Sequence, residues 1–149
     1  MQTQLAVSEA GRPSAYRRSP PLQAYDSFRI LIVNDDMRSA ATLKKTLCAL
    51  GYSTTLVAHS GKRALAAVAA YSPAVAILDL ELGDMTGYSL ARRLRSHATA
   101  QVRDLPLIAI AERCEFATGQ LVQAAGFVGW LTKPVPSWLL SRLLQRSVI

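Results

Sequence analysis

Cysteine is scarce in this sequence, and its scarcity limits the class of protein that the chain can be. Cys48 and Cys114 are its two cysteines. Both lie within apolar patterns of helical period, so we interpret them as reduced packing residues. Reduced cysteines are typical of cytosolic proteins, whereas small secreted domains depend on several disulfides. The sequence therefore predicts a cytoplasmic protein that is held together by its core.

Signals for secretion and for membrane insertion are also missing. Residues 1–10 have neither a basic start nor an apolar run, so they do not resemble a signal peptide. The most apolar region, residues 64–80, is interrupted by Ser72 and Pro73 and ends in an acid, which excludes a membrane span. Because half of the 149 residues are apolar, we expect a globular protein with a substantial core.

Acidic residues are few, with ten Asp and Glu against 17 Lys and Arg and a net charge of +7. An excess of positive charge can indicate a nucleic-acid partner. Here the basic residues are spread over several predicted helices, and no basic run is interleaved with aromatic residues. We interpret them as solvated helix surfaces and expect neither nucleic acid nor a membrane as a partner. Half of the acids fall in two short clusters: Asp35, Asp36, Asp79, Glu81 and Asp84.

The chain divides into a predicted disordered tail, residues 1–27, and a domain, residues 28–149. The tail contains Gly and Pro breaks and has no apolar face. In the domain, predicted strands lie at residues 30–33, 53–58, 74–78, 105–110 and 126–131. Helical patterns alternate with them, at residues 37–50, about 61–71, 87–94, 114–125 and 138–144. This alternation is typical of an α/β fold with a doubly wound, five-stranded parallel sheet.

Several residues are predicted to define the helices. Ser60 and Thr86 are expected to be N-caps, and Gly51 is expected to end the first helix. Ser72 and Pro73 should close the second helix. The first helix carries its apolar residues at helical spacing: Met37, Ala41, Leu43, Leu47 and Leu50.

Polar residues follow the predicted strands where each strand ends. Because parallel strands end at the same edge of a sheet, these residues should converge there with Ala111, which follows the fourth strand: Asn34, Asp35, Asp36, Asp79 and Lys133. Carboxylates held close together repel one another, so we expect a bound divalent cation, Mg²⁺, with Lys133 able to pair with a phosphate. The alternative is a neutralised Asp–Lys cluster that only ties the strand ends together.

Three stretches of the sequence together resemble the receiver domain of two-component response regulators. They are residues 30–35, 77–87 and 131–134. The resemblance implies a flavodoxin-like fold with strand order 2-1-3-4-5. It also implies that Asp79 accepts a phosphoryl group, in a phosphorelay, from a histidine kinase or a histidine phosphotransfer protein.

The same resemblance implies roles for the neighbouring residues. Asp35 and Asp79 would bind Mg²⁺ through their side chains, Glu81 through its backbone carbonyl and Asn34 through water. Lys133 would contact the phosphate. Asn34 stands where the family usually has an acid, and the lost negative charge should weaken Mg²⁺ binding. Asp36 would compensate if the first strand ended one residue later.

Two further departures from the family concern its conformational switch. Ala111 stands where the family has Thr or Ser, whose hydroxyl closes on the phosphate, and Ala has no donor. Trp130 occupies the position of the switching aromatic residue, although a core aromatic residue is an equal alternative. Thr86 and Gly83 replace an Asp and a Pro of the family, and we interpret Thr86 as a helix cap.

Three functions remain open on these observations. The favoured one is a phosphoryl-accepting receiver that acts by protein contact and has no DNA-binding output domain. The second is a degenerate receiver, a binding or dimerisation module independent of phosphorylation, which Asn34 and Ala111 motivate. The third is a phosphatase of the haloacid dehalogenase type, for which Glu81 fits the second acid but Gly83 stands where a Thr is required. We expect no enzymatic activity beyond slow hydrolysis of the protein's own aspartyl phosphate.

Apolar residues near the end of the chain suggest a contact surface. The last two predicted helices carry more of them than a small monomer needs: Phe116, Leu121, Trp138, Leu139 and Leu143. Exposed apolar area of this kind marks interfaces. A homodimer or a kinase contact through these helices and the fifth strand is the resulting hypothesis.

Overall fold

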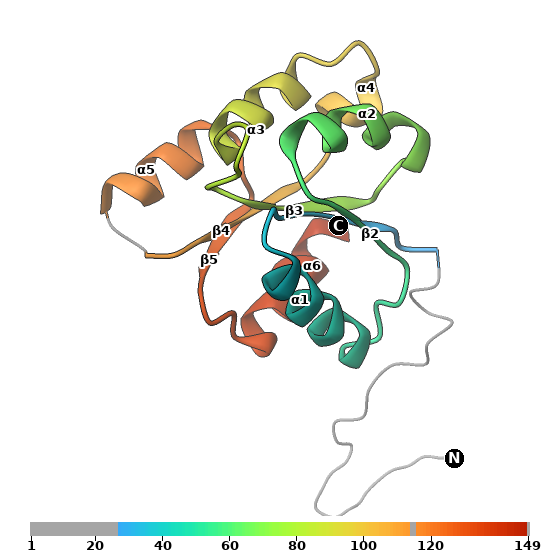
Figure 1. Ribbon diagram of the computed structural model, residues 1–149, viewed down its shortest axis with the longest axis vertical. Coiled ribbons are helices and arrows are strands. Elements are labelled where there is room, and N and C mark those ends of the chain that lie inside the picture. The colour runs from blue at the N-terminus through green and yellow to red at the C-terminus, as the bar shows by residue number, and fades with distance from the viewer. Residues whose placement is uncertain (1–26, 114–115, 149) are drawn as a thin grey trace, which may run out of the picture.

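The computed structural model describes residues 27–113 and 116–148, without the side chains of residues 116–118 and 148. In these residues five parallel strands form one sheet in the order β2-β1-β3-β4-β5 (Figure 1). The strands are β1 (Ile30–Val33), β2 (Thr55–Ala58), β3 (Val75–Asp79), β4 (Leu107–Ala111) and β5 (Gly129–Thr132). The predicted α/β class and the predicted strand order are both confirmed.

Helices cover both faces of this sheet. They are α1 (Met37–Ala49), α2 (Gly61–Tyr71), α3 (Gly87–Arg95), α4 (Ala100–Arg103), α5 (Phe116–Ala124) and α6 (Ser137–Val148). Figure 1 shows α1 and α6 on one face and α2, α3, α4 and α5 on the other. None of the described helices is long and apolar enough to span a membrane.

The core consists of two apolar layers, one on each side of the sheet. Leu31 and Val33 of β1 join the layer under α2 to α5, whereas Ile30 and Ile32 join the layer under α1 and α6. All four side chains are buried. A strand covered on both faces has no polar side, which explains why β1 and β3 are continuous apolar runs in the sequence.

Local side-chain interactions begin and end the helices largely as predicted. Ser60 accepts the N–H of Arg63 at 3.0 Å, and Thr86 accepts the N–H of Ser89 at 3.0 Å, so both are N-caps. Gly51 follows α1 with a φ of 100°, a left-handed conformation that favours glycine at this position. Ser72 ends α2 with a φ of 55°.

Some element boundaries differ from the sequence predictions. α4 was missed, because a single turn with one buried apolar residue, Val102, produces no periodicity. β5 begins at Gly129 rather than at residue 126. The reason is that Gly126 has a φ of 88° and donates its N–H to Gln123 at the end of α5, and Phe127 donates to Val122. These residues end a helix instead of pairing with β4, which itself begins at Leu107.

The buried face of α1 was predicted only in part. Ala40, Leu43 and Leu47 are buried, whereas Met37 and Ala41 are exposed. Cys48 is exposed, so its interpretation as a packing residue is wrong. It follows the buried Leu47 and is turned by about 100° from it around the helix axis. Cys114 lies outside the described residues.

Arg95 departs from the prediction that the basic residues are solvated. Its guanidinium donates to the backbone carbonyls of Arg103 and Leu105, at 2.8 Å each, and of Gly126, at 3.0 Å. Burial lowers the pKa of Arg95, with Asp104 acting in the opposite direction. Arg95 therefore ties the end of α3 to the turns that precede β4 and β5.

Candidate functional site

Asp79 is the last residue of β3, the central strand of the sheet, and it is only 7% exposed. Its Oδ1 accepts the backbone N–H of Glu81 at 3.0 Å, and its Oδ2 lies 3.1 Å from Nζ of Lys133. A buried carboxylate is costly unless such donors compensate for its lost hydration. Each oxygen of Asp79 therefore has a donor, one from the following loop and one from a cation.

Lys133 follows β5, and its side chain extends past the end of β4 to Asp79 at the end of β3. Its backbone N–H donates to the carbonyl of Ala111 at 3.1 Å, which holds the residue beside the end of β4. Its Nζ also lies 3.7 Å from Oε1 of Glu112. Burial lowers the pKa of Lys133, but the hydrogen bond and charge of Asp79, with the charges of Glu112 and Asp36, outweigh it and raise the pKa. The ammonium group is therefore charged at neutral pH.

Asn34 follows β1 and is buried. Its Oδ1 accepts the N–H of Asp36 at 2.9 Å, and its backbone carbonyl lies 3.0 Å from Nδ1 of His59, which donates there in one tautomer. The side-chain oxygen thus shapes the turn after the strand. Its role in holding a metal-bound water stays a prediction.

Asp36 does not supply the acid that is missing at position 34. β1 ends at Val33, as predicted, and Asp36 is the N-cap of α1. Its Oδ1 accepts the N–H of Arg38 at 3.0 Å and its Oδ2 accepts the hydroxyl of Ser39 at 3.1 Å. These bonds, led by the one from Arg38, lower the pKa of Asp36. The hypothesis that Asp36 compensates for Asn34 is wrong, because its carboxylate binds the helix terminus.

The loop between β3 and α3 is anchored to the start of α2. Asp84 accepts the backbone N–H groups of Gly61 and Lys62, at 2.9 Å each. These hydrogen bonds lower the pKa of Asp84, and the one from Gly61 has the larger effect. Met85 lies against Gly61, where any Cβ would collide with the Met85 side chain. Asp84 is thus occupied with a helix N-terminus, which favours a negative charge.

Asp35 and Asp79 come from the ends of adjacent strands. Two carboxylates at an open edge are typical of a magnesium site, which does not require a complete set of protein ligands. Within the described ranges no three Asp, Glu, His or Cys side chains are grouped as a metal site. Mg²⁺ needs only one or two carboxylates and takes its other ligands from water and phosphate oxygens. Asp35 is exposed, with its Oδ2 beside Gly83 of the β3–α3 loop. These oxygen donors are of the kind that Mg²⁺ takes, and the assignment of Asp35, Asp79 and the Glu81 carbonyl as its ligands stays a prediction.

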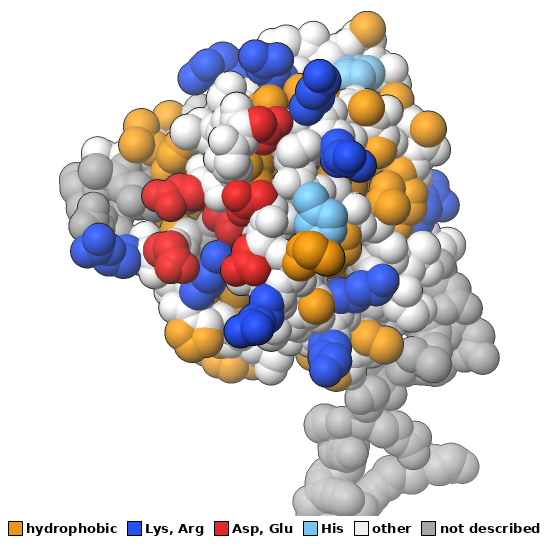
Figure 2. Space-filling view, in the orientation of Figure 1, with side chains coloured by type: hydrophobic (Ala, Val, Ile, Leu, Met, Phe, Trp, Pro, Cys, Tyr) orange, Lys and Arg blue, Asp and Glu red, His pale blue; other side chains and the backbone are white. Residues whose placement is uncertain are grey.

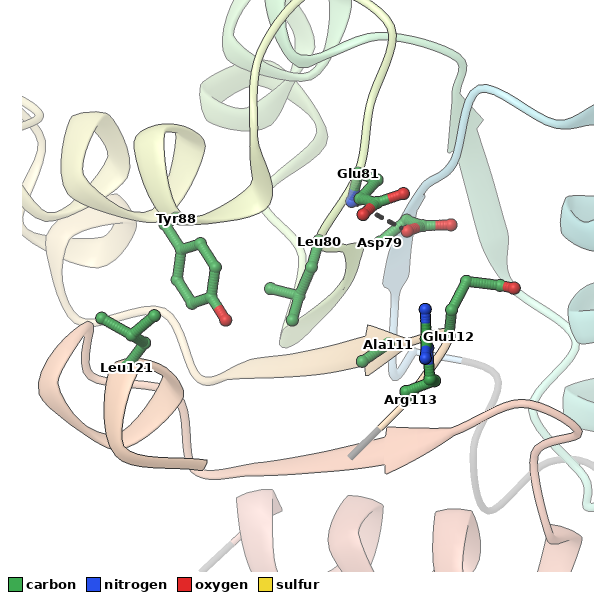
Figure 3. Close-up of a pocket in the computed structure, with 8 residues that line it drawn as sticks. All are labelled: Asp79, Leu80, Glu81, Tyr88, Ala111, Glu112, Arg113 and Leu121. Carbon is green, nitrogen blue, oxygen red and sulfur yellow. Dashed lines mark hydrogen bonds between the residues drawn. The ribbon is translucent and has the colours of Figure 1, made fainter. Parts of the chain in front are cut away.

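A cavity of about 580 Å³ opens beside Asp79 (Figure 3). Its lining comprises Asp79, Leu80, Glu81, Tyr88, Ala111, Glu112, Arg113 and Leu121. Ala111 ends β4 and contributes only a methyl group to this space. In Figure 2 the Asp and Glu side chains gather in one area of the visible surface, with Lys and Arg side chains around it. The cavity therefore opens in an acidic region of an otherwise basic protein.

Trp130 lies in β5 and is 37% exposed, so it is not a core residue. A Cβ placed on Gly119 would be 3.2 Å from the indole ring, which shows that the ring packs against α5 where the helix has no side chain. This position is compatible with the predicted switch, which stays a prediction.

The chain matches the response regulator receiver domain family over residues 30–145. It belongs to this family.

This receiver domain is 33% identical over 120 residues to the response regulator MprA of Mycobacterium bovis, in an alignment that covers 80% of the chain and 49% of that protein. The chain thus spans about half the length of the curated relatives that it matches. A solved putative response regulator from Chloroflexus aurantiacus superposes with a TM-score of 0.75 at 27% identity, covering 81% of this chain and 97% of the other. The chemotaxis response regulator CheY4 of Vibrio cholerae gives a TM-score of 0.70 at 28% identity, covering 80% and 97%.

Two residues at the site of this receiver domain were missed by the sequence analysis. His59 lies against the Asn34 backbone, and Arg113 lines the cavity beside Asp79. Arg113 carried a usable signal, because it is the first basic residue after the fourth strand and lies two positions after Ala111. His59 carried none, since its contact depends on how β2 is placed beside β1.

Proposed function

We propose that this receiver domain accepts a phosphoryl group on Asp79, delivered by a histidine kinase or a histidine phosphotransfer protein. Receiver domains are generally signalling modules rather than enzymes, and they generally interact with these two classes of protein. The observation that supports the proposal here is the environment of Asp79. Its carboxylate ends the central strand, pairs with Lys133 at 3.1 Å and borders an open cavity.

The transfer requires one nucleophile and little rearrangement of the protein. A carboxylate oxygen of Asp79 attacks the phosphorus of a phosphohistidine, the new oxygen–phosphorus bond forms, and the imidazole nitrogen leaves with the electron pair of the broken bond. The Glu81 N–H and the Lys133 ammonium already orient the two carboxylate oxygens. Lys133 is then placed to pair with the phosphoryl oxygens as they gain charge.

Asp35, Asp79 and the backbone carbonyl of Glu81 are the residues that would hold Mg²⁺, with Asn34 acting through water. The ion, when bound, supplies positive charge to the phosphoryl oxygens. One fewer acid after β1 should leave its binding weaker than in a site with two acids there. We expect the acceptor to work slowly for this reason.

Intact mass measurement tests the proposal directly. Incubation of the full chain with a small phosphodonor and Mg²⁺ should add one phosphoryl group, and Asp79→Asn should abolish the addition. Asp104→Asn is the matched control, because it removes an exposed acid that precedes β4, at the opposite edge of the sheet from the end of β3 where Asp79 lies. Absence of an adduct on the folded wild-type protein under several donors would contradict the proposal.

A second candidate is a receiver that binds its partner whether or not it is phosphorylated. Ala111 favours it, because a methyl group cannot transmit the arrival of a phosphoryl group by hydrogen bonding. In that case Asp79→Asn would leave partner affinity unchanged.

The partner contact is proposed to involve β5, the edge strand of the sheet, with α5 and α6, which contact β5 from opposite faces of the sheet. Leu121 and Trp138 are 56% and 63% exposed, so they are available for it. Leu143 is buried in the core and Leu139 is half-buried against it, and the side chain of Phe116 lies outside the described residues. Of the residues that suggested this surface, Leu121 and Trp138 therefore carry the proposal.

A further inference from the structure

Arg113 is a cation at the cavity beside Asp79 that the proposed transfer does not yet use. It is exposed and lies just after β4. In the described parts of the chain no hydrogen bond or ion pair holds its guanidinium group. In Figure 3 the Arg113 side chain extends from the segment just after β4 and lines the same cavity as Asp79. Among the described residues, this charged side chain at the cavity therefore has no hydrogen-bond or ion-pair partner.

The charges around the cavity favour a second cation once Asp79 is phosphorylated. Asp79, Glu81 and Glu112 supply negative charge, and Lys133 is already shared between Asp79 at 3.1 Å and Glu112 at 3.7 Å. Phosphorylation replaces a carboxylate by a group that carries roughly one more negative charge. Of the protein's own cations, Lys133 is then shared between the Glu112 carboxylate and the new phosphoryl oxygens, which leaves room for a second cation beside any bound Mg²⁺.

The length and shape of arginine suit a cavity that Ala111 leaves without a donor at the end of β4. A hydroxyl at position 111 would supply a donor there, whereas Ala111 contributes only a methyl group to the lining of the cavity of about 580 Å³. A long side chain from residue 113 can cross such a space. Its planar guanidinium can also donate two parallel hydrogen bonds to one phosphoryl group, which a hydroxyl cannot do.

We infer that Arg113 binds the phosphoryl group on Asp79 and supplies the donor that Ala111 lacks. This inference rests on the proposed function, since it requires a phosphoryl group at Asp79. Ala111 then does not leave the site without a donor, because Arg113, two residues later in the chain, offsets the hydroxyl that is missing at the end of β4.

Beryllofluoride, which mimics a phosphoryl group on an aspartate, is the probe for this inference. Its affinity is measured by calorimetry on the full chain at one saturating Mg²⁺ concentration. Arg113→Gln should weaken binding by about tenfold or more, the usual size of a lost hydrogen bond to a charged group. Arg113→Lys keeps the positive charge but loses the planar guanidinium with its two parallel donors. Its affinity for beryllofluoride should lie between those of wild type and Arg113→Gln. Arg146→Gln, an exposed arginine of α6, should bind as wild type does.

A double variant connects the effect to Ala111. Ala111→Thr should strengthen binding more in the Arg113→Gln background than in the wild type, because the two donors serve the same group. Unfolding midpoints should be equal for wild type and Arg113→Gln, since the side chain is exposed and the described residues hold no partner for it.

The outcomes separate this inference from the proposed function. Equal beryllofluoride affinity in wild type and Arg113→Gln, with a phosphoryl adduct formed from a small donor, overturns the role of Arg113 alone. An equal loss in Arg146→Gln also overturns it, because the effect would then be one of net charge. If wild type forms no adduct and binds no beryllofluoride, the proposed function and this inference fail together.

Discussion

Two segments border the Asp79 carboxylate, and they are held very differently. The β3–α3 loop is tied at both ends and in its middle. Glu81 donates to Asp79, Asp84 accepts two N–H groups of α2, and Gly87 donates to the carbonyl of Leu80 at 2.8 Å. The described residues after β4, Glu112 and Arg113, have only the 3.7 Å ion pair between Glu112 and Lys133.

This difference separates two tasks that a phosphorylation site has to perform. The nucleophile and the proposed metal ligands must be fixed before the donor arrives, because transfer depends on position and charge. A segment that reports phosphorylation must instead make contacts that are absent beforehand. The anchored β3–α3 loop suits the first task, and the sparsely bonded segment after β4 suits the second.

The largest expected effect comes from disturbing the anchored loop at Gly87. A Cβ at this position would lie 2.6 Å from the carbonyl oxygen of Asp79 and 2.9 Å from Cα of Leu80, and both are backbone atoms that cannot turn aside. Gly87→Ala should therefore destabilise the protein by about 1–3 kcal/mol, as overpacking does. Chemical unfolding measures the change in the free energy of unfolding.

Gly83→Ala is the control for Gly87→Ala, because it lies in the same loop. Its Cβ would approach only the exposed Asp35 carboxylate, at 3.3 Å. The effect on stability should stay within about 0.5 kcal/mol. Similar costs for the two substitutions would show that the loop is no more rigid at its junction with β3 than at its tip.

An intermediate effect is expected from adding a donor on the sparsely bonded side. Ala111→Thr should increase the structural response to phosphorylation, since a hydrogen bond to a charged group shifts a two-state equilibrium by about tenfold or more. The fluorescence of Trp130 reports the response when Trp138→Phe removes the second indole. Ala111→Val has the same shape without the hydroxyl and should behave as wild type does. An equal signal in the Thr and Val variants would mean that the switch does not pass through this position.

The smallest effect is expected at Asp84, because its carboxylate is fully exposed. Hydrogen bonds from Gly61 and Lys62 lower its pKa below the usual 3.8. A carboxyl group with a lowered pKa stabilises the folded state above its unfolded pKa, and this contribution is lost as the pH falls through the lower folded value. Asp84→Ala should therefore unfold more easily than wild type at neutral pH, and the difference should shrink in acid. A difference that stays constant from neutral pH into acid would show that the charge of Asp84 is not involved.

The site was predicted from the sequence more completely than its surroundings were. Asp79 and Lys133 each follow an apolar run, so their meeting at one sheet edge depends only on parallel strands, and the structure joins them at 3.1 Å. Asp36 and Asp84 looked like further members of the acidic cluster. Both bind helix N-termini instead, a use that a cluster of acids in a sequence does not reveal.

Helix faces and short elements were the weakest part of the prediction. Cys48 and Ala41 fitted a helical period but are exposed, because alanine and cysteine pack or face solvent according to how the helix is rotated on the sheet. Arg95 was expected to be solvated, yet it binds three carbonyl groups of distant turns. Such contacts join residues far apart in sequence, and no local pattern records them.

The sequence by itself determined the parallel sheet, its strand order through the family resemblance, and the acid and lysine that meet at its edge. Fully apolar strands and their polar ends are local features, and topology then brings those ends together. Tertiary structure alone decided which acids remain near Asp79, how the β3–α3 loop is anchored, and that Arg113 and Ala111 line the same cavity. These depend on distances between separate elements, which are set by the packing of helices on the sheet.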